Sequence, residues 1–410
     1  MKKIAFIVIL TVILAAVALG LCSCNNDDVT TLYVYNWGEY ISDGSEGTLD
    51  VNAAFEEYYY QTYGERIKVN YSTYSSNESM YDKISSGTAN YDVIIPSDYM
   101  IERLISEGLL AKLNYDNIPN YKYISDDFKG ENVYYDPQNE YSIPYAYGIV
   151  GIIYNTKLVD ADDPTIGSWG LMWNEKYTGS ILQFNNSRDA FGTALYYLGY
   201  DVNDATEAQW QEALELLKKQ KSVVQGYVMD EVFNKMISGS AAIASYYAGD
   251  FFTMYEGNSD LAFYYPKEGT NIYIDAMCIP ATSNNQLIAE RYIDFMLSEQ
   301  PAIANAEYTC YASPNLLVTN NQEYIDYMAE LHPDAMKILY SEDNDFETTF
   351  YKNLSREKLT MLNSLWEELK IESPIGNSIY IGCGILVAAL AVVAVVFVVR
   401  KKKRERYDED

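Results

Sequence analysis

Hydrophobic and polar positions change their period repeatedly in the part of the chain that follows residue 30. Alternating or short apolar runs, which are typical of strands, occupy residues 31–37, 66–74 and 91–96. Runs with the apolar spacing of an amphipathic helix follow them at residues 49–64, 77–87 and 101–113, and Gly87 closes the second. This succession of strand and helix favours an α/β fold with a largely parallel sheet.

The pattern continues in the second half of the chain, where the apolar runs are longer. Residues 141–155 (YSIPYAYGIVGIIYN) predict one strand that leaves the first lobe. Further strands are expected up to Phe184 and within 238–252 and 261–280, and helices within 289–315. We expect two lobes that share crossing strands, made of residues 30–146 with 274–316 and of residues 147–273 with 317–372.

The first residues have the layout of an export signal. Lys2 and Lys3 precede an apolar run over residues 4–21. The segment 21–24 (LCSC) also resembles a bacterial lipoprotein box, which implies a signal peptide over residues 1–24 and lipidation of Cys24. The alternative is an uncleaved anchor, or a plain signal peptide with two incidental cysteines.

A second apolar run lies near the other end of the chain. Residues 379–399 are 21 uncharged residues, a length that spans a bilayer as one transmembrane helix. The basic segment RKKKRER follows at once, so the positive-inside rule predicts a cytoplasmic tail over residues 400–410. The domain before the span is then extracytoplasmic, either periplasmic or at the cell surface. Lipid on Cys24, the C-terminal helix, or both would anchor it to the membrane.

The acidity of the chain excludes one class of partner. The formal net charge is -29, and without Lys2, Lys3 and the charged tail the chain keeps 21 basic against 54 acidic residues. Nucleic-acid binding needs clustered Lys and Arg, so no nucleic-acid partner is expected. Such acidity suits cationic ligands, and it also simply keeps a protein soluble.

The few cysteines and the single histidine argue against metal and redox chemistry. Cys278 and Cys310 are the only cysteines between the two apolar ends, and the chain has no CxxC motif or Cys/His cluster. We therefore expect no zinc or redox site and no cofactor. A disulfide between these cysteines and two free thiols are both open readings. His332 is expected at the surface, and one histidine gives little basis for Ser-His-Asp or Cys-His catalysis.

Aromatic and acidic side chains gather where the expected strands end. Trp37, Glu39 and Tyr40 follow the first strand, and Ser97, Asp98 and Tyr99 follow the third. In open α/β sheets ligands bind outside the carboxyl ends of the strands. We therefore expect both sets to line one crevice.

Several motifs together carry a resemblance to a known family. They are LYVYNWGEYI, VNYSTYSSNESMYDKI, YDVIIPSDYM, YSIPYAYG, YPKEGTNIYIDAMCIP and YASPN. In this order and spacing, from about residue 31 to about residue 370, the chain resembles the spermidine/putrescine-binding receptors of bacterial ABC importers. The resemblance implies a two-lobed type II periplasmic-binding-protein-like fold that traps its ligand by hinge closure. It also implies a monomeric receptor whose partners are the permease subunits of the importer.

The resemblance indicates further ligand-binding residues by motif position. They are Asn186 and Asp189 in a polar turn, Tyr246, Tyr273 and Asp275 near strand ends, and Tyr311 before Ser-Pro-Asn. Relatives carry Trp at the positions of Tyr246 and Tyr273. Asn186 stands where spermidine-preferring relatives carry an acid. The preferred polyamine is therefore open, and the departure favours the shorter diamine, putrescine.

These residue types suit a polyamine, which is a methylene chain with ammonium groups along it. Carboxylates accept charge-assisted hydrogen bonds from ammonium groups, and aromatic rings cover methylenes and attract cations. We therefore expect a polyamine receptor and no catalytic residues. The alternatives are a receptor of the same fold for another organic cation, an amino acid, a sugar or iron, a hydrolase that uses Glu39 and Asp275 as paired carboxylates, and an adhesive or sensory surface protein.

Overall fold

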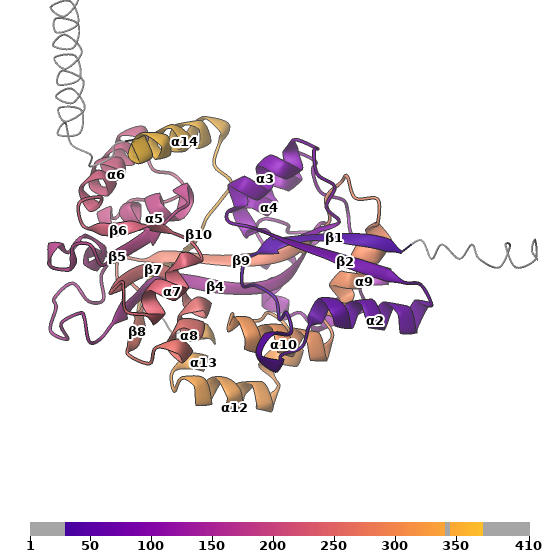
Figure 1. Ribbon diagram of the computed structural model, residues 1–410. Helices are drawn as coiled ribbons and strands as arrows, with labels where there is room; N and C mark the ends of the chain where they lie inside the picture. The colour runs from indigo at the N-terminus through magenta and orange to yellow at the C-terminus, as the bar shows by residue number, and fades with distance from the viewer. Residues whose placement is uncertain (1–28, 341–344, 372–410) are drawn as a thin grey trace, which may run out of the picture. The chain divides into compact units, whose positions relative to one another are not determined.

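The computed structural model describes residues 29–340 and 345–371, and it divides the chain into two compact units (Figure 1). Unit 1 takes the chain up to Val150 together with Tyr247–Ser259 and Asn271–Asn353. Unit 2 takes Gly151–Tyr246, Asp260–Thr270 and, of the described residues that follow, 354–371. Each unit is therefore assembled from separate segments, and the chain passes between the units more than once.

The sheet of unit 1 has the strand order β2-β1-β3-β9-β4. Its strands are Thr30–Trp37 (β1), Ile67–Tyr74 (β2), Val93–Ile94 (β3), Ser142–Asn155 (β4) and Thr270–Cys278 (β9), and the short strand Thr348–Phe350 (β10) pairs with β9. β1 is parallel to β2 and β3, whereas β9 is antiparallel to both β3 and β4. The sheet is therefore mixed. The expectation of a largely parallel sheet is corrected, because β9 returns the chain against the direction of β4.

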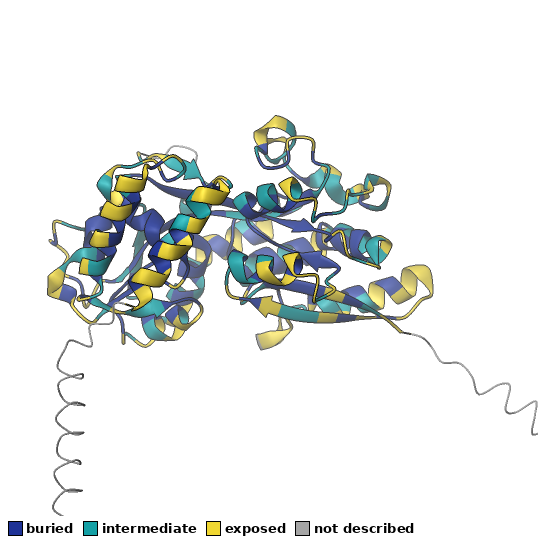
Figure 2. Cartoon of the chain, turned by 90° about the horizontal axis from the view of Figure 1, so that it is seen from above, coloured by how far each residue is buried: buried dark blue, intermediate teal, exposed yellow. Residues whose placement is uncertain are grey.

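Helices cover both faces of this sheet (Figure 1). α2 (Val51–Tyr63) and α9 (Gln286–Met296) share one hydrophobic core with the sheet, and α3 (Asn77–Ser85) and α4 (Asp98–Ser106) share the other. Val34 and Tyr35, neighbours on β1, belong to different cores because successive strand residues point to opposite faces. Figure 2 shows the result, since much of the sheet is buried while most helices have a buried and an exposed side. The strand β2, at the end of the strand order, alternates between buried and exposed residues in its first half.

The remaining helices of unit 1 come from two distant parts of the chain. They are α8 (Ala248–Gly257), α10 (Glu299–Thr309), α11 (Leu316–Thr319), α12 (Gln322–Leu331) and α13 (Ala335–Tyr340). α12 packs on α10, and α13 packs on α8. These contacts keep residues 317–340 in unit 1, whereas the sequence assigned all of 317–372 to the second lobe.

Unit 2 is also an α/β structure. Its sheet has the order β4-β7-β5-β6, in which β5 (Ile181–Phe184) lies parallel to β6 (Val224–Val228) and β7 (Ile243–Tyr247). The far end of β4 pairs with β8 (Leu261–Tyr264) in the antiparallel sense. The helices are α5 (Ser187–Leu198), α6 (Glu207–Gln220), α7 (Glu231–Ile237) and α14 (Arg356–Ile371). α5 and α6 pack together over the fully buried Trp210.

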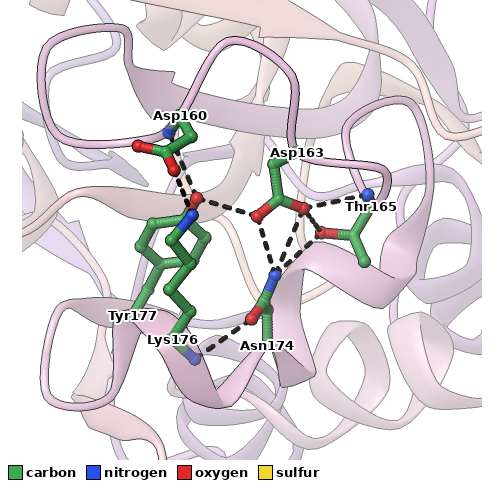
Figure 3. Close-up of polar contacts among 6 residues, drawn as sticks. All are labelled: Asp160, Asp163, Thr165, Asn174, Lys176 and Tyr177. Carbon is green, nitrogen blue, oxygen red and sulfur yellow. Dashed lines mark hydrogen bonds and ion pairs between the residues drawn. The ribbon is translucent and has the colours of Figure 1, made fainter.

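A hydrogen-bond network organises the loop that precedes β5 in unit 2 (Figure 3). The carboxylate of Asp163, which is buried, accepts hydrogen bonds from the side chains of Thr165, Asn174 and Tyr177. An ion pair between Lys176 and Asp160 adjoins it. Since these donors come from separate turns, the one carboxylate fixes the course of the whole loop.

Membrane association is not visible in the described part of the chain. Over residues 29–340 and 345–371, no helix is long and apolar enough to cross a bilayer. The signal peptide expected over residues 1–24, Cys24, the span expected at 379–399 and the tail at 400–410 all lie outside the described residues.

Candidate functional site

The turn after β1 carries Trp37, Glu39 and Tyr40. The Nε1 of Trp37 donates to the carbonyl oxygen of Ile95 (3.0 Å), and its ring centroid lies 4.7 Å from that of Tyr74. Glu39 takes a left-handed backbone conformation with φ of 50° and is exposed, while Tyr40 at the next position is buried. The turn therefore separates the exposed carboxylate from a phenol that points into unit 1.

Tyr40 reaches a buried carboxylate on β9. Its hydroxyl donates to Oδ2 of Asp275 (2.7 Å), a residue that is only 4% exposed. The rings of Tyr145 and Tyr311 lie edge-on to that of Tyr40, with centroid distances of 5.5 and 4.7 Å. Burial, and after it the charge of Asp275, raises the pKa of Tyr40 well above its usual value. The phenol is therefore a neutral donor to the carboxylate at all physiological pH values.

Ser97 and Tyr99, at the start of α4, are joined through α3. The Nδ2 of Asn77 donates to Oγ of Ser97 and to the hydroxyl of Tyr99, both at 3.1 Å. The hydroxyl of Tyr99 donates in turn to Glu78 (3.0 Å). Ser97 also forms a β-bridge with Asp275. Unit 1 thus brings the segments after β1 and β3 to the same residue of β9, because Tyr40 contacts the carboxylate of Asp275 and Ser97 pairs with its backbone.

Two tyrosine rings lie directly on the backbone because the residues beneath them are glycines. A Cβ at Gly148 would come 2.5 Å from the hydroxyl of Tyr273, and a Cβ at Gly249 would come 2.3 Å from the ring of Tyr311. The two rings are 6.4 Å apart. A side chain at either glycine would displace the ring above it, so these glycines position the aromatic residues of the site.

The structure adds two residues to this group that the sequence reasoning missed. The hydroxyl of Tyr311 donates to Oδ2 of Asp250 (2.9 Å), a buried carboxylate in the first turn of α8. The ring of Tyr247 lies edge-on to that of Tyr273 at 5.3 Å. The available signal was the sequence YAGD at residues 247–250, where an acid follows an aromatic strand end as it does in NWGE at 36–39.

The expected residues of unit 2 form a group of their own. The Oδ1 of Asn186 accepts from the backbone N of Asp189 (2.8 Å), and its Nδ2 donates to the carboxylate of Asp189 (2.8 Å). Asn186 thus caps α5 and orients Asp189 in the first turn, where the helix dipole favours an acid. Tyr246, by contrast, is 3% exposed and stacks on Phe184 at 5.6 Å, as a core residue does.

Two further expectations concern the cysteines and the histidine. Cys278 and Cys310 are both buried and free, which excludes the disulfide alternative. His332 is half-buried, with its ring 4.7 Å from that of Tyr255, so it does not lie freely at the surface as expected. In the described parts of both units, no group of three or more His, Cys, Asp or Glu side chains is arranged to hold a metal ion.

A small cavity lies behind Tyr311 in unit 1, between β4 and α10. Its volume is about 20 Å³, and Asn305, Thr309 and Ser313 are among its lining residues. That volume holds about one water molecule. This cavity is therefore too small to be the site of an organic ligand.

Comparison with known proteins agrees with this fold. Residues 53–331 match the family of bacterial extracellular solute-binding proteins, and the chain belongs to that family. It has the two-domain α/β fold of periplasmic binding proteins. The class is a binding protein and not an enzyme, which confirms the sequence-based prediction.

The relatives within this family confirm the particular resemblance that the motifs indicated. The spermidine/putrescine-binding periplasmic protein of Salmonella typhimurium LT2 is 32% identical over 330 residues, which cover 80% of this chain and 90% of the relative. The Escherichia coli K12 protein of the same name is 33% identical over 302 residues, which cover 73% of this chain and 82% of the relative.

Two solved structures extend the similarity to three dimensions. A spermidine/putrescine ABC transporter protein from Listeria monocytogenes has a TM-score of 0.72 at 32% identity, covering 84% of this chain and 100% of that one. The spermidine/putrescine substrate-binding protein PotD of Streptococcus pneumoniae has a TM-score of 0.62 at 32% identity, covering 83% of this chain and 99% of that one.

Proposed function

We propose that the chain is an extracytoplasmic polyamine receptor that binds putrescine or spermidine and delivers it to the permease subunits of an ABC-type importer. The observation that carries this proposal is the buried pair of Tyr40 and Asp275 among tyrosine rings. The names of its relatives, which are spermidine/putrescine-binding proteins, support the same ligand class.

Unit 1 offers the two kinds of surface that a diamine needs. Asp275 and Asp250 are buried carboxylates, and each accepts a hydrogen bond from a tyrosine hydroxyl. Each can accept charge-assisted hydrogen bonds from an ammonium group, worth about 1.5 to 3 kcal/mol. The rings of Tyr40, Tyr273 and Tyr311 supply apolar faces for methylenes and cation–π contacts of about 0.5 to 2 kcal/mol each.

Each unit also carries further residues that the proposal assigns to ligand binding. They are Trp37, Glu39, Ser97 and Tyr99 in unit 1 and Asn186 and Asp189 in unit 2. Tyr246 keeps its place in the proposal, and Tyr247, whose ring contacts that of Tyr273, is added to it. Asn186 is uncharged and engaged with Asp189, which supports a preference for the shorter diamine over spermidine.

The finer location is also a proposal. Lipid on Cys24, the apolar segment 379–399, or both hold the receptor at the outer face of the cell membrane, where it acts as a monomer. The signal layout, the lipoprotein-like box and the uncharged run of residues support this. Cell fractionation of a chain that ends at Ser378 separates the two anchors: release of this variant from the membrane assigns the anchoring to the C-terminal segment, and its retention assigns it to the N-terminal segment with Cys24.

Thermal unfolding of the purified full chain with a panel of solutes tests the ligand class. A ligand at 100 times its Kd stabilises a protein by about 2.7 kcal/mol. We expect putrescine and spermidine to raise the unfolding midpoint, and arginine and ferric citrate to leave it unchanged. A shift with one of the latter and none with the polyamines would reassign the chain to another class of solute receptor.

Trp37→Ala tests the site within the same assay. Loss of the indole is expected to weaken putrescine binding at least about tenfold, which corresponds to ~1.4 kcal/mol. The unfolding midpoint without ligand reports separately whether the variant is folded. An unchanged Kd in a folded variant would remove Trp37 from the site.

A further inference from the structure

Asp98 is a buried carboxyl that the proposed site does not use, although it stands between Ser97 and Tyr99, which the site does use. Its exposed fraction is 0%. Its Oδ1 accepts a hydrogen bond from the backbone N of Tyr99 (2.7 Å), and its Oδ2 accepts one from the backbone N of Ile274 (3.3 Å). The second bond ties Asp98 to the residue that precedes Asp275 on β9.

The chain segments that carry the two carboxyls run side by side. Ser97 forms its β-bridge with Asp275, and the backbone N of Ala276 donates to the carbonyl oxygen of Pro96 (3.0 Å). Asp98 and Asp275 are therefore held on paired backbone in the interior of unit 1. Neither can move away from the other without breaking this pairing.

The groups around Asp98 are acids and phenols. The titratable side chains that face it are Asp275 on β9 and Tyr134 and Tyr135 from the segment that precedes β4. None of the ion pairs among the described residues includes Asp98. The hydroxyl of Tyr135 is buried, and it has no hydrogen-bond partner among the described residues. Among the described residues, Asp98 therefore has no ion-pair partner that would offset its charge.

We propose that Asp98 and Asp275 act as a coupled pair of carboxyls, and that a ligand ammonium group arriving at Asp275 drives the release of a proton from this pair to solvent. The inference rests on the proposed function, because it requires a cationic ligand at Asp275. Burial raises the pKa of Asp98 well above its usual value and outweighs the hydrogen bonds from Tyr99, Ile274 and Tyr134, which lower it, while the charge of Asp275 raises it further. An ammonium group at Asp275 offsets that charge, so it lowers the pKa of Asp98 again.

The sign of the pH dependence follows from this. Asp98 has a higher pKa in the free chain than in the complex. At pH values between these two pKa values, the free chain therefore binds more protons than the complex does. Affinity therefore rises with pH across this window, by at most about tenfold per pH unit for one proton. Asp98 is a positioning residue in this scheme, since it acts through Asp275 and not by touching the ligand.

Calorimetric titration of the full chain with putrescine in paired buffers measures the proton directly. Each pair has one buffer of small and one of large ionisation enthalpy, for example phosphate and imidazole near pH 7 and acetate and MES near pH 5.5. Both amines of putrescine stay charged at these pH values, as those of lysine do. Within at least one pair, we expect the heats of binding in the two buffers to differ. The difference should equal the release of a substantial fraction of one proton multiplied by the difference between the ionisation enthalpies of the two buffers. Equal heats in both buffers at every pH would overturn the proposal.

Asp98→Asn assigns the proton. The variant is expected to bind putrescine with the same heat in both buffers, and a variant that releases as many protons as the wild type would overturn the proposal. If the variant does not fold, infrared spectra of the wild type with and without putrescine are compared instead. Binding of putrescine must then remove the absorption band of a buried protonated carboxyl, and persistence of that band contradicts the proposal. Absence of binding heat in every buffer is a different result, which contradicts the proposed function itself.

Discussion

The replacement Asp275→Asn isolates the charge at the centre of the proposed site. Asparagine keeps the shape of the side chain and an acceptor oxygen for the hydroxyl of Tyr40, which donates to Asp275 at 2.7 Å. It removes only the negative charge that a ligand ammonium group would meet. Because Asp275 is only 4% exposed, removing this charge also removes a desolvation cost. Stability without ligand should therefore hold or rise slightly.

The size of the effect on binding follows from one lost charge-assisted interaction. Such hydrogen bonds contribute about 1.5 to 3 kcal/mol, and each 1.4 kcal/mol is about tenfold in Kd. Asp275→Asn should therefore weaken putrescine binding by about ten- to 150-fold. Asp275→Ala should lose at least as much, since it also leaves the Tyr40 hydroxyl without its acceptor.

Isothermal titration calorimetry with putrescine measures this loss of affinity in Asp275→Asn and in a matched control variant. Asp92 is a second buried carboxylate of unit 1, which accepts hydrogen bonds from Ser283 (2.6 Å) and the backbone of Tyr33 (2.9 Å). Asp92→Asn should lower stability and leave Kd within about threefold, because it loses hydrogen bonds of the scaffold and no ligand contact. Equal Kd values for Asp275→Asn and the wild type would refute the reasoning.

Three further predictions concern packing, stability and pH. Gly249→Ala should displace the ring of Tyr311 and weaken putrescine binding at least about tenfold, while Gly226→Ala, whose Cβ meets nothing within 4 Å, should leave Kd unchanged in the same titration. Asp163→Ala should lower the free energy of unfolding by at least about 2 kcal/mol in urea denaturation, since it orphans several buried donors. Burial lowers the pKa of His332, so the unfolded chain binds the proton first and stability falls as pH drops below about 6.5. Unfolding midpoints measured across this range should fall less in His332→Gln than in the wild type, and parallel curves would contradict this.

Elements whose signal is local are predictable from the sequence. The apolar run at 141–155 corresponds to β4 (Ser142–Asn155), and the helical spacing at 49–64 corresponds to α2 (Val51–Tyr63). The mixed character of the sheet is not local, because it depends on which strands lie next to each other. β9 and β4 pair across more than a hundred residues, and nothing in either strand specifies their relative direction.

The boundary between β7 and α8 lies beside two candidate site residues. The sequence predicts a strand within residues 238–252, and the structure ends that strand at Tyr247 and begins a helix at Ala248. Since successive strand residues point to opposite faces, the choice between Tyr246 and Tyr247 decides which ring is in the core. The sequence favours Tyr246, and the structure brings Tyr247 to Tyr273.

The candidate site is predictable in its composition and not in its contacts. The turn at Trp37–Tyr40 and the carboxylate of Asp275 stand out as residues, but the hydrogen bond that joins Tyr40 to Asp275 depends on tertiary packing. The sequence places Asp98 beside Ser97 and Tyr99 after the third strand, but it gives no sign that this carboxyl is buried, because an acid in the first turn of a helix is common for reasons of the helix dipole. Only its complete burial sets it apart.

Calorimetric titration of the wild-type chain with putrescine and spermidine tests the central claim most directly. The account predicts saturable heat with one polyamine bound per chain, tighter for putrescine, and no heat with arginine under the same conditions. No binding heat with either polyamine, from a chain that unfolds cooperatively, would contradict it.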